Sequence, residues 1–238
     1  MNTWKFTGTV AWGLVVAAAF VAAQVFTTGV VALHGKGELS EAQAARVLDA
    51  ATVDGYVLSL STFASALVCV PLLLAIARLK RGSSLRDYFA LRTVPARTLF
   101  AWIGITLVLL ALSDGLTWLL GKPIVPDFMK VVNATADPLW LLWLALIVAA
   151  PLLEETFFRG FLFTGFAASA AGPVGAIVIT SALWAAIHLQ YDLYGIATLF
   201  VLGLVFGLAR LRTGSLYVPL TLHAMTNLIA ATQAALIG

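Results

Sequence analysis

Long apolar segments, each about the length of a membrane-spanning helix, make up most of the chain. A helix needs about 20 predominantly apolar residues to cross a bilayer, and only helices and closed barrels satisfy their backbone hydrogen bonds inside lipid. The sequence therefore predicts an all-α, polytopic transmembrane helix bundle of about seven to eight helices, with the lipid bilayer around it. The apolar segments lie at residues 9–33, 55–77, 98–120, 138–163, 173–190, 193–209 and 217–237.

Composition excludes several other classes of protein. Of the 238 residues, 61% are hydrophobic and 11% are charged, whereas soluble domains are about 25% charged. The one cysteine, Cys69, excludes an intramolecular disulfide and a zinc site built from several cysteines. No block of basic residues is interleaved with aromatic ones, so we expect no nucleic-acid partner. Because no linker or repeat divides the chain, we expect residues 1–238 to form a single integral membrane domain.

Lysines and arginines are unevenly distributed among the connecting loops. By the positive-inside rule, the most basic loop faces the cytoplasm, and the other loops alternate from there. We therefore expect a multi-pass protein of the inner cell membrane with its N-terminus in the cytoplasm. The basic residues placed inside are Lys5, Arg78, Lys80, Arg81, Arg86, Arg92, Arg97, Arg210 and Arg212. Those placed outside are Lys36, Arg46, Lys122 and Lys130.

Three charged residues interrupt the apolar stretch PLLEETFFRGFLF, which spans residues 151–163. A charged side chain near the centre of a membrane costs roughly 2.5–3.5 kcal/mol, so Glu154, Glu155 and Arg159 need partners or a function. Glu155 and Arg159 have the i,i+4 spacing with the acid first, which is the favourable order for an ion pair along a helix. The sequence leaves a structural and a functional explanation of this pair open.

Glu154 has no partner on its own helix, because the residues three and four positions further on are both phenylalanines. An unpaired ionisable residue inside a membrane indicates a functional site by default. Three other polar residues of the second half of the chain can join it: His188, His223 and Asn227. His223 and Asn227 have the i,i+4 spacing and share one helix face. A lone buried histidine is more often a packing residue, but these four groups together favour one site around an intramembrane polar cavity.

Such a site has the parts of an amide hydrolase that forms no covalent intermediate. A carboxylate and an imidazole can hold a water molecule, and the carboxylate can take its proton as general base. A second imidazole and an amide can donate hydrogen bonds to the oxyanion that develops. As an alternative, Glu154, His188 and His223 can form a three-ligand zinc site.

The depth of His188 is a separate question. With the predicted orientation, Glu154 and His223 fall toward the cytoplasmic half of the membrane, whereas His188 lies near the outer end of its segment. Two arrangements stay open: a hairpin that turns within the protein and lines a cavity, or a turn at the membrane surface.

Three short stretches carry a resemblance to a known family. EETFFR (residues 154–159), WAAIH (184–188) and HAMTN (223–227) resemble, in this order, the EExxxR, FxxxH and HxxxN motifs of the CPBP intramembrane proteases. That family includes the type II CAAX prenyl endopeptidases and bacterial proteins linked to bacteriocin processing or immunity. The resemblance covers about residues 140–230, so we expect the catalytic core within residues 138–238.

The resemblance implies a role for each matching polar residue. Glu154 and His188 would activate a water molecule, and His223 and Asn227 would stabilise the oxyanion. Glu155 and Arg159 would organise the site.

The resemblance also implies a glutamate-type mechanism, so we expect no metal or other cofactor, with zinc kept as the alternative. One departure is Trp184, which stands where the motif usually has phenylalanine. We interpret this change as affecting the lining of the site.

We therefore expect a CAAX protease-like intramembrane endopeptidase that acts on a peptide or protein substrate at the membrane. One alternative is a non-enzymatic membrane protein that binds a bacteriocin or gives immunity to it. Another is a proton-coupled transporter in which glutamate and histidine relay protons, although the chain lacks the paired, interrupted segments of repeat-built transporters. The sequence names neither the substrate nor its prenylation state.

Overall fold

The computed structural model describes residues 2–237, and this range contains helices and no strand. The first half of the chain forms α1 (Phe6–Leu33), α2 (Glu41–Ala51), α3 (Gly55–Leu79), α4 (Leu85–Tyr88), α5 (Ala96–Leu119) and α6 (Asp127–Thr135). One continuous helical stretch follows, in which η marks a π-helical turn: α7 (Leu139–Leu144), η1 (Ala145–Ala149), α8 (Ala150–Glu155), η2 (Thr156–Leu162) and α9 (Phe163–Ala167). The chain ends with α10 (Gly172–Ala186), α11 (Leu193–Thr213) and α12 (Tyr217–Ile237).

Within residues 2–237, six helices are long and apolar enough to cross a membrane: α1, α3, α5, the stretch Leu139–Ala167, α11 and α12. This confirms the predicted polytopic all-α bundle. The remaining apolar segment, predicted at residues 173–190, forms the shorter α10 and ends at Ala186. Its 15 residues cover about 22 Å, less than the roughly 30 Å of a bilayer's hydrocarbon core. His188 therefore lies beyond the helix that was expected to carry it.

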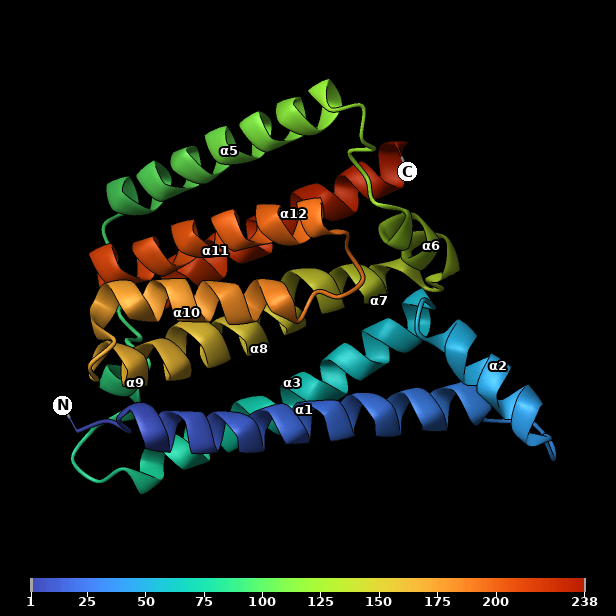
Figure 1. Ribbon diagram of the computed structural model, residues 1–238, viewed down its shortest axis with the longest axis horizontal. Coiled ribbons are helices and arrows are strands. Elements are labelled where there is room, and N and C mark those ends of the chain that lie inside the picture. The colour runs from blue at the N-terminus through green and yellow to red at the C-terminus, as the bar shows by residue number, and fades with distance from the viewer. Residues whose placement is uncertain (1, 238) are drawn as a thin grey trace.

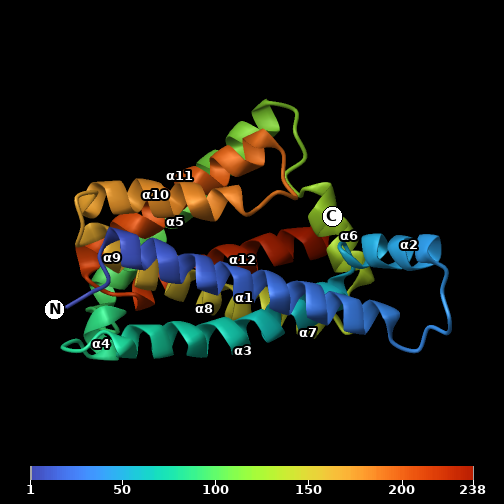
Figure 2. The ribbon, with the colours of Figure 1, turned by 60° about the horizontal axis from the view of Figure 1, so that its bottom comes forward.

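The helices run side by side, and the connections gather at the two ends of the bundle (Figure 1). The N-terminus, α9 and the end of α11 that carries Arg210 and Arg212 lie at the left end. The opposite end carries α2, α6 and the end of α12. Figure 2 places α4, in the middle of the most basic loop, at the same end as α9. The basic loops predicted to share one side of the membrane therefore share one end of the bundle.

The short helix α2 lies at the opposite end and begins with a capping box. Ser40 Oγ accepts the amide N–H of Gln43 at 3.4 Å, and the Ser40 amide donates to Gln43 Oε1 at 2.9 Å. These two bonds satisfy amide groups that the first turn of a helix leaves unpaired.

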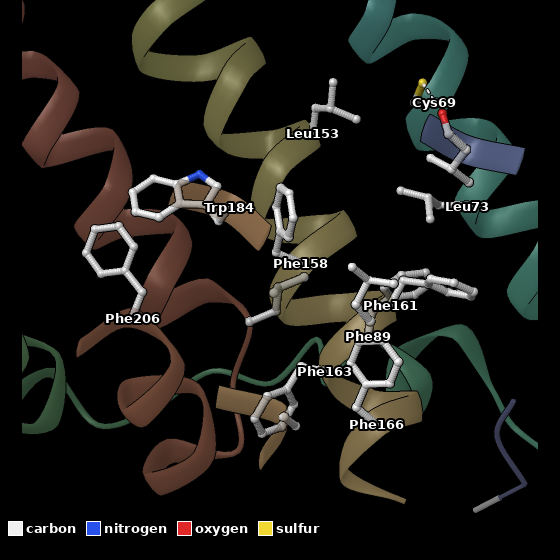
Figure 3. Close-up of a cluster of buried hydrophobic side chains, with 14 of the residues drawn as sticks. Cys69, Leu73, Phe89, Leu153, Phe158, Phe161, Phe163, Phe166, Trp184 and Phe206 are labelled. Carbon is white, nitrogen blue, oxygen red and sulfur yellow. Dashed lines mark hydrogen bonds between the residues drawn. The ribbon is translucent and has the colours of Figure 1, made fainter. Parts of the chain in front are cut away.

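The stretch Leu139–Ala167 lies in the core of the bundle. Its aromatic residues Phe158, Phe161 and Phe166 are almost fully buried. In Figure 3, Leu73 of α3 lies on one side of this helix, and Trp184 of α10 lies on the other side. Glu155 and Arg159 are 0% exposed, so these two charges of the stretch face protein rather than lipid.

A glycine lets α1 approach this stretch closely. A Cβ at Gly165 of α9 would overlap the side chain of Thr9 of α1, which is fully buried and donates its hydroxyl to the Trp4 carbonyl at 2.9 Å. Small residues at such crossings are what allow membrane helices to pack tightly, because lipid gives them no hydrophobic driving force.

The variant Gly165→Ala should lower the midpoint of thermal unfolding in detergent, because an added methyl group in a tight contact costs about 1–3 kcal/mol. Gly104→Ala on α5 is the matched control, since a Cβ there meets nothing within 4 Å and alanine favours helix over glycine. The control should keep or raise the midpoint. Equal midpoints for the two variants would contradict the close approach of α1 and α9.

Candidate active site

A buried ion pair lies at the centre of the candidate site. Arg159 Nη1 and Glu155 Oε1 are 3.0 Å apart, and both side chains are 0% exposed. The i,i+4 pair predicted from the sequence is thus confirmed. Arg159 Nη2 donates to the carbonyl of Gly203 on α11 at 3.2 Å. A Cβ at Gly203 would come within 3.2 Å of the same guanidinium nitrogen, so a glycine here makes room for the arginine.

The same carboxylate oxygen also holds His223 of α12. His223 Nδ1 lies 2.9 Å from Glu155 Oε1, and the histidine is 3% exposed. A carboxylate paired with arginine only accepts hydrogen bonds, so Nδ1 carries the hydrogen and donates. The tautomer and the ring orientation are thereby fixed, and Nε2 lies on the opposite edge of the ring.

Nε2 of His223 faces the second carboxylate, Glu154, at 3.9 Å from its Oε2. This is too long for a hydrogen bond, but a third atom can lie within hydrogen-bond distance of both. The Glu154 side chain is 19% exposed, whereas Glu155 is fully buried. Glu154 is therefore the carboxylate of the pair that solvent or a substrate can reach.

Glu154 receives a direct hydrogen bond from the indole Nε1–H of Trp184, on α10. Trp184 is 1% exposed, and its ring packs edge to face against both His188 and His223, with centroids 5.3 and 5.2 Å apart. The sequence indicated only that Trp184 lines the site. The tryptophan at position 184, where the motif usually has phenylalanine, was the signal in the sequence for this additional hydrogen-bond donor.

His188 lies in the turn that follows α10, where its ring helps to end the helix. The Trp184 carbonyl lies 2.8 Å from His188 Nδ1, and the His188 amide donates instead to the Ala185 carbonyl at 3.1 Å. A carbonyl only accepts hydrogen bonds, so Nδ1–H donates and Nε2 is free. Across residues 2–237, no carboxylate oxygen lies within 4.0 Å of a His188 ring nitrogen. The structure thus brings Glu154 next to His223. His188 contacts Trp184, through its ring and through the Trp184 carbonyl, and does not contact Glu154 directly.

The turn that carries His188 lies at the end of α5. Asp192 is exposed and pairs with Lys122 at 2.8 Å, just beyond that helix. This hydrogen bond holds the pKa of the Asp192 carboxyl below its usual range. The pair places the turn beside the loop that follows α5, and both arrangements left open by the sequence stay predictions.

Asn227 lies one turn beyond His223 on α12 and is anchored by its amide. Asn227 Nδ2 donates to the Leu146 carbonyl at 2.7 Å, and an amide has a second N–H for another acceptor.

Leu146 belongs to η1, and the Arg159 carbonyl, which accepts from Arg210 Nε at 3.1 Å, belongs to η2. Such π-helical turns occur frequently at functional sites. The sequence pattern gave no sign of them, since an apolar helix shows no periodicity.

The zinc alternative needs three ligands around one point. Within residues 2–237, no group of three or more His, Cys, Asp or Glu side chains gathers in a way that could hold a metal ion. Glu154 Oε2 and His223 Nε2 lie 3.9 Å apart, but neither ring nitrogen of His188 lies within 4.0 Å of a carboxylate oxygen of the described residues. The zinc site therefore stays a prediction, which metal analysis of the purified protein tests.

Comparisons with known proteins agree with the motifs. Residues 136–229 match the family model described as type II CAAX prenyl endopeptidase Rce1-like, which confirms the family resemblance over that segment. A protein from Escherichia coli described as "Uncharacterized 24.3 kDa protein" is 39% identical over 114 residues, covering 44% of this chain and 52% of that protein. The chain thus spans about half the length of this curated relative. No solved structure matches the chain.

Arg159→Met should destabilise the fold by about 3–5 kcal/mol, because it leaves Glu155 buried without its counter-charge. The double variant with Glu155→Gln should recover much of that loss, since it removes the stranded charge. Thermal and denaturant unfolding in detergent measure both. Arg92→Met is the control, because the Arg92–Asp87 pair is exposed, at 59% and 48% of the two side chains, and exposed pairs contribute little. A single variant as stable as the control would contradict the central role of the buried pair.

Proposed function

We propose that this chain is an intramembrane endopeptidase in which Glu154 is the general base, proceeding from the Rce1-like match over residues 136–229. At the level of the family, that match supports a CAAX-type protease in a multi-pass membrane protein. The observation that carries the finer proposal is the position of Glu154: a partly exposed carboxylate, which no lysine or arginine among residues 2–237 pairs with, facing His223 Nε2 at 3.9 Å.

The reaction begins with a water molecule bound to Glu154 and to the free Nε2 of His188. Glu154 takes a proton from the water as its oxygen attacks the carbonyl carbon of the scissile peptide bond. The carbonyl oxygen becomes an oxyanion, which accepts hydrogen bonds from Asn227 Nδ2 and, when Nε2 of His223 carries a proton as well as Nδ1, from that ring nitrogen. The oxyanion then re-forms the C=O bond, the C–N bond of the peptide breaks, and the proton held by Glu154 passes to the leaving nitrogen, so the carboxylate of Glu154 is restored.

Glu155 and Arg159 act on this site without touching the substrate, because both are fully buried. Glu155 fixes the orientation of His223, and Arg159 holds Glu155. The two adjacent glutamates therefore have different roles: the partly exposed Glu154 reacts, and the buried Glu155 positions His223.

The substrate class is a peptide or protein at the membrane, since the site lies among helices apolar enough to span it. From the positive-inside rule and the basic end of the bundle we infer that the N-terminus lies in the cytoplasm. The proposed location is the inner cell membrane.

Glu154→Gln should reduce peptide cleavage by about 100- to 10,000-fold, because an amide cannot act as a general base. The assay compares detergent-purified wild type and variant on a quenched fluorescent peptide library, with and without a strong chelator. Glu38→Gln, in the exposed loop before α2, is the matched control and should cleave at the wild-type rate.

Each arm of this assay decides one question. A folded Glu154→Gln variant with full activity would contradict the role of Glu154 as general base. Loss of wild-type activity with chelator would support the zinc site. A folded wild type that cleaves no peptide would point to the bacteriocin-immunity alternative.

Asn227→Ala should lower kcat by about 100- to 1,000-fold with little change in KM, as expected for loss of one oxyanion donor. Thr232→Ala on the same helix is the control, because its hydroxyl donates only along the helix, to the Leu228 carbonyl at 2.8 Å. Unfolding midpoints of both variants show whether the Leu146 contact also matters for stability. A raised KM at unchanged kcat would assign Asn227 to substrate binding instead.

A further inference from the structure

Trp184 connects the groups of the candidate site that do not contact one another. Its indole N–H donates to Glu154 Oε2, and its backbone carbonyl accepts from His188 Nδ1 at 2.8 Å. These are the two residues assigned to hold the water molecule. Their own side chains lie too far apart to bond directly, so their relative position depends on Trp184.

The indole hydrogen bond restricts the base to one geometry. The nitrogen of Trp184 lies on the ring edge turned toward the helix that carries Leu153 (Figure 3), which is also the helix of Glu154. With Oε2 occupied by the indole, the carboxylate cannot rotate freely, and Oε1 is left to accept the proton of the water molecule.

The buried cation strengthens this arrangement. The guanidinium carbon of Arg159 lies 4.7 Å from the centroid of the Trp184 ring, which is within the range of a cation–π interaction. A cation over the ring face draws electron density from the indole and makes its N–H a better donor. The Glu155–Arg159 pair thereby acts on Glu154 through the tryptophan as well as on His223 directly.

We propose that Trp184 is a positioning residue for catalysis, whose side chain fixes the base Glu154 and whose main chain fixes His188. This inference rests on the proposed function for its kinetic consequence. Phenylalanine fills the same space and keeps the carbonyl but has no N–H. The tryptophan of this chain therefore adds an interaction that the usual residue of the motif cannot make.

Trp184→Phe should lower kcat by about 10- to 100-fold, the effect of losing a hydrogen bond to a charged group, with KM changed less than about two-fold. Replacing Trp184 with benzothienylalanine, in which sulfur takes the place of the N–H, should give the same loss while preserving the ring shape. Trp143→Phe is the matched control, because the buried Trp143 Nε1 has no hydrogen-bond partner among the described residues. Wild-type kcat in the benzothienylalanine protein would reduce Trp184 to a packing role and overturn the proposal.

A second measurement needs no activity. In uniformly ¹⁵N-labelled protein, each of the seven tryptophans gives one indole N–H signal, and Trp184→Phe identifies the signal of Trp184. Glu154→Gln should move this signal upfield, because a neutral amide is a weaker acceptor than a carboxylate, and leave the Trp143 signal in place. An unmoved Trp184 signal would overturn the contact itself. If the signal moves but wild type cleaves no peptide, the proposed function fails while the contact stands.

Discussion

The buried ion pair between Glu155 and Arg159 is the interaction on which the rest of the site depends. Two charges that are both fully buried cost several kcal/mol of desolvation each, and their attraction offsets this only with good geometry. Here each partner is used twice. Glu155 Oε1 also accepts from His223, and Arg159 also donates to Gly203. The pair therefore connects α8 with α12 through Glu155, and η2 with α11 through Arg159.

The second consequence of the pair is a separation of roles between adjacent glutamates. Successive residues of a helix point about 100° apart, so Glu155 faces the arginine while Glu154 faces α10 and α12. One carboxylate is buried and paired with the arginine, and its neighbour accepts a hydrogen bond from the neutral indole of Trp184. A single helix thus supplies one fully buried carboxylate and one that is partly exposed.

Much of this arrangement could be predicted from the sequence. The apolar segments predicted the helices, and the spacing of Glu155 and Arg159 predicted their ion pair, because both depend on local geometry. The missing local partner of Glu154 was also evident. His223 was expected near Glu154 from the motifs, and the two lie 3.9 Å apart. The hydrogen bond from Trp184 was not expected, since that residue comes from a helix whose packing no local pattern specifies.

Two features escaped prediction for different physical reasons. The π-helical turns η1 and η2 add a residue to a turn, which leaves no mark in a sequence that is apolar at every position. The segment that carries His188 was predicted too long, because hydropathy continues past Ala186 whereas the His188 ring takes the carbonyl that a further turn would use. Apolar character measures affinity for lipid and does not locate a helix end.

The shortness of α10 has a consequence for the membrane itself. Its residues Val174, Val178 and Leu183 are 71%, 45% and 43% exposed, so this helix of about 22 Å presents apolar side chains outward. A hydrophobic surface shorter than the hydrocarbon layer is matched by local thinning of the bilayer. We therefore expect a thinner bilayer beside α10, which would bring headgroups and water closer to the turn of His188. Hydrophobic mismatch would thus bring the aqueous phase closer to the candidate site and to the carboxylate of Glu154.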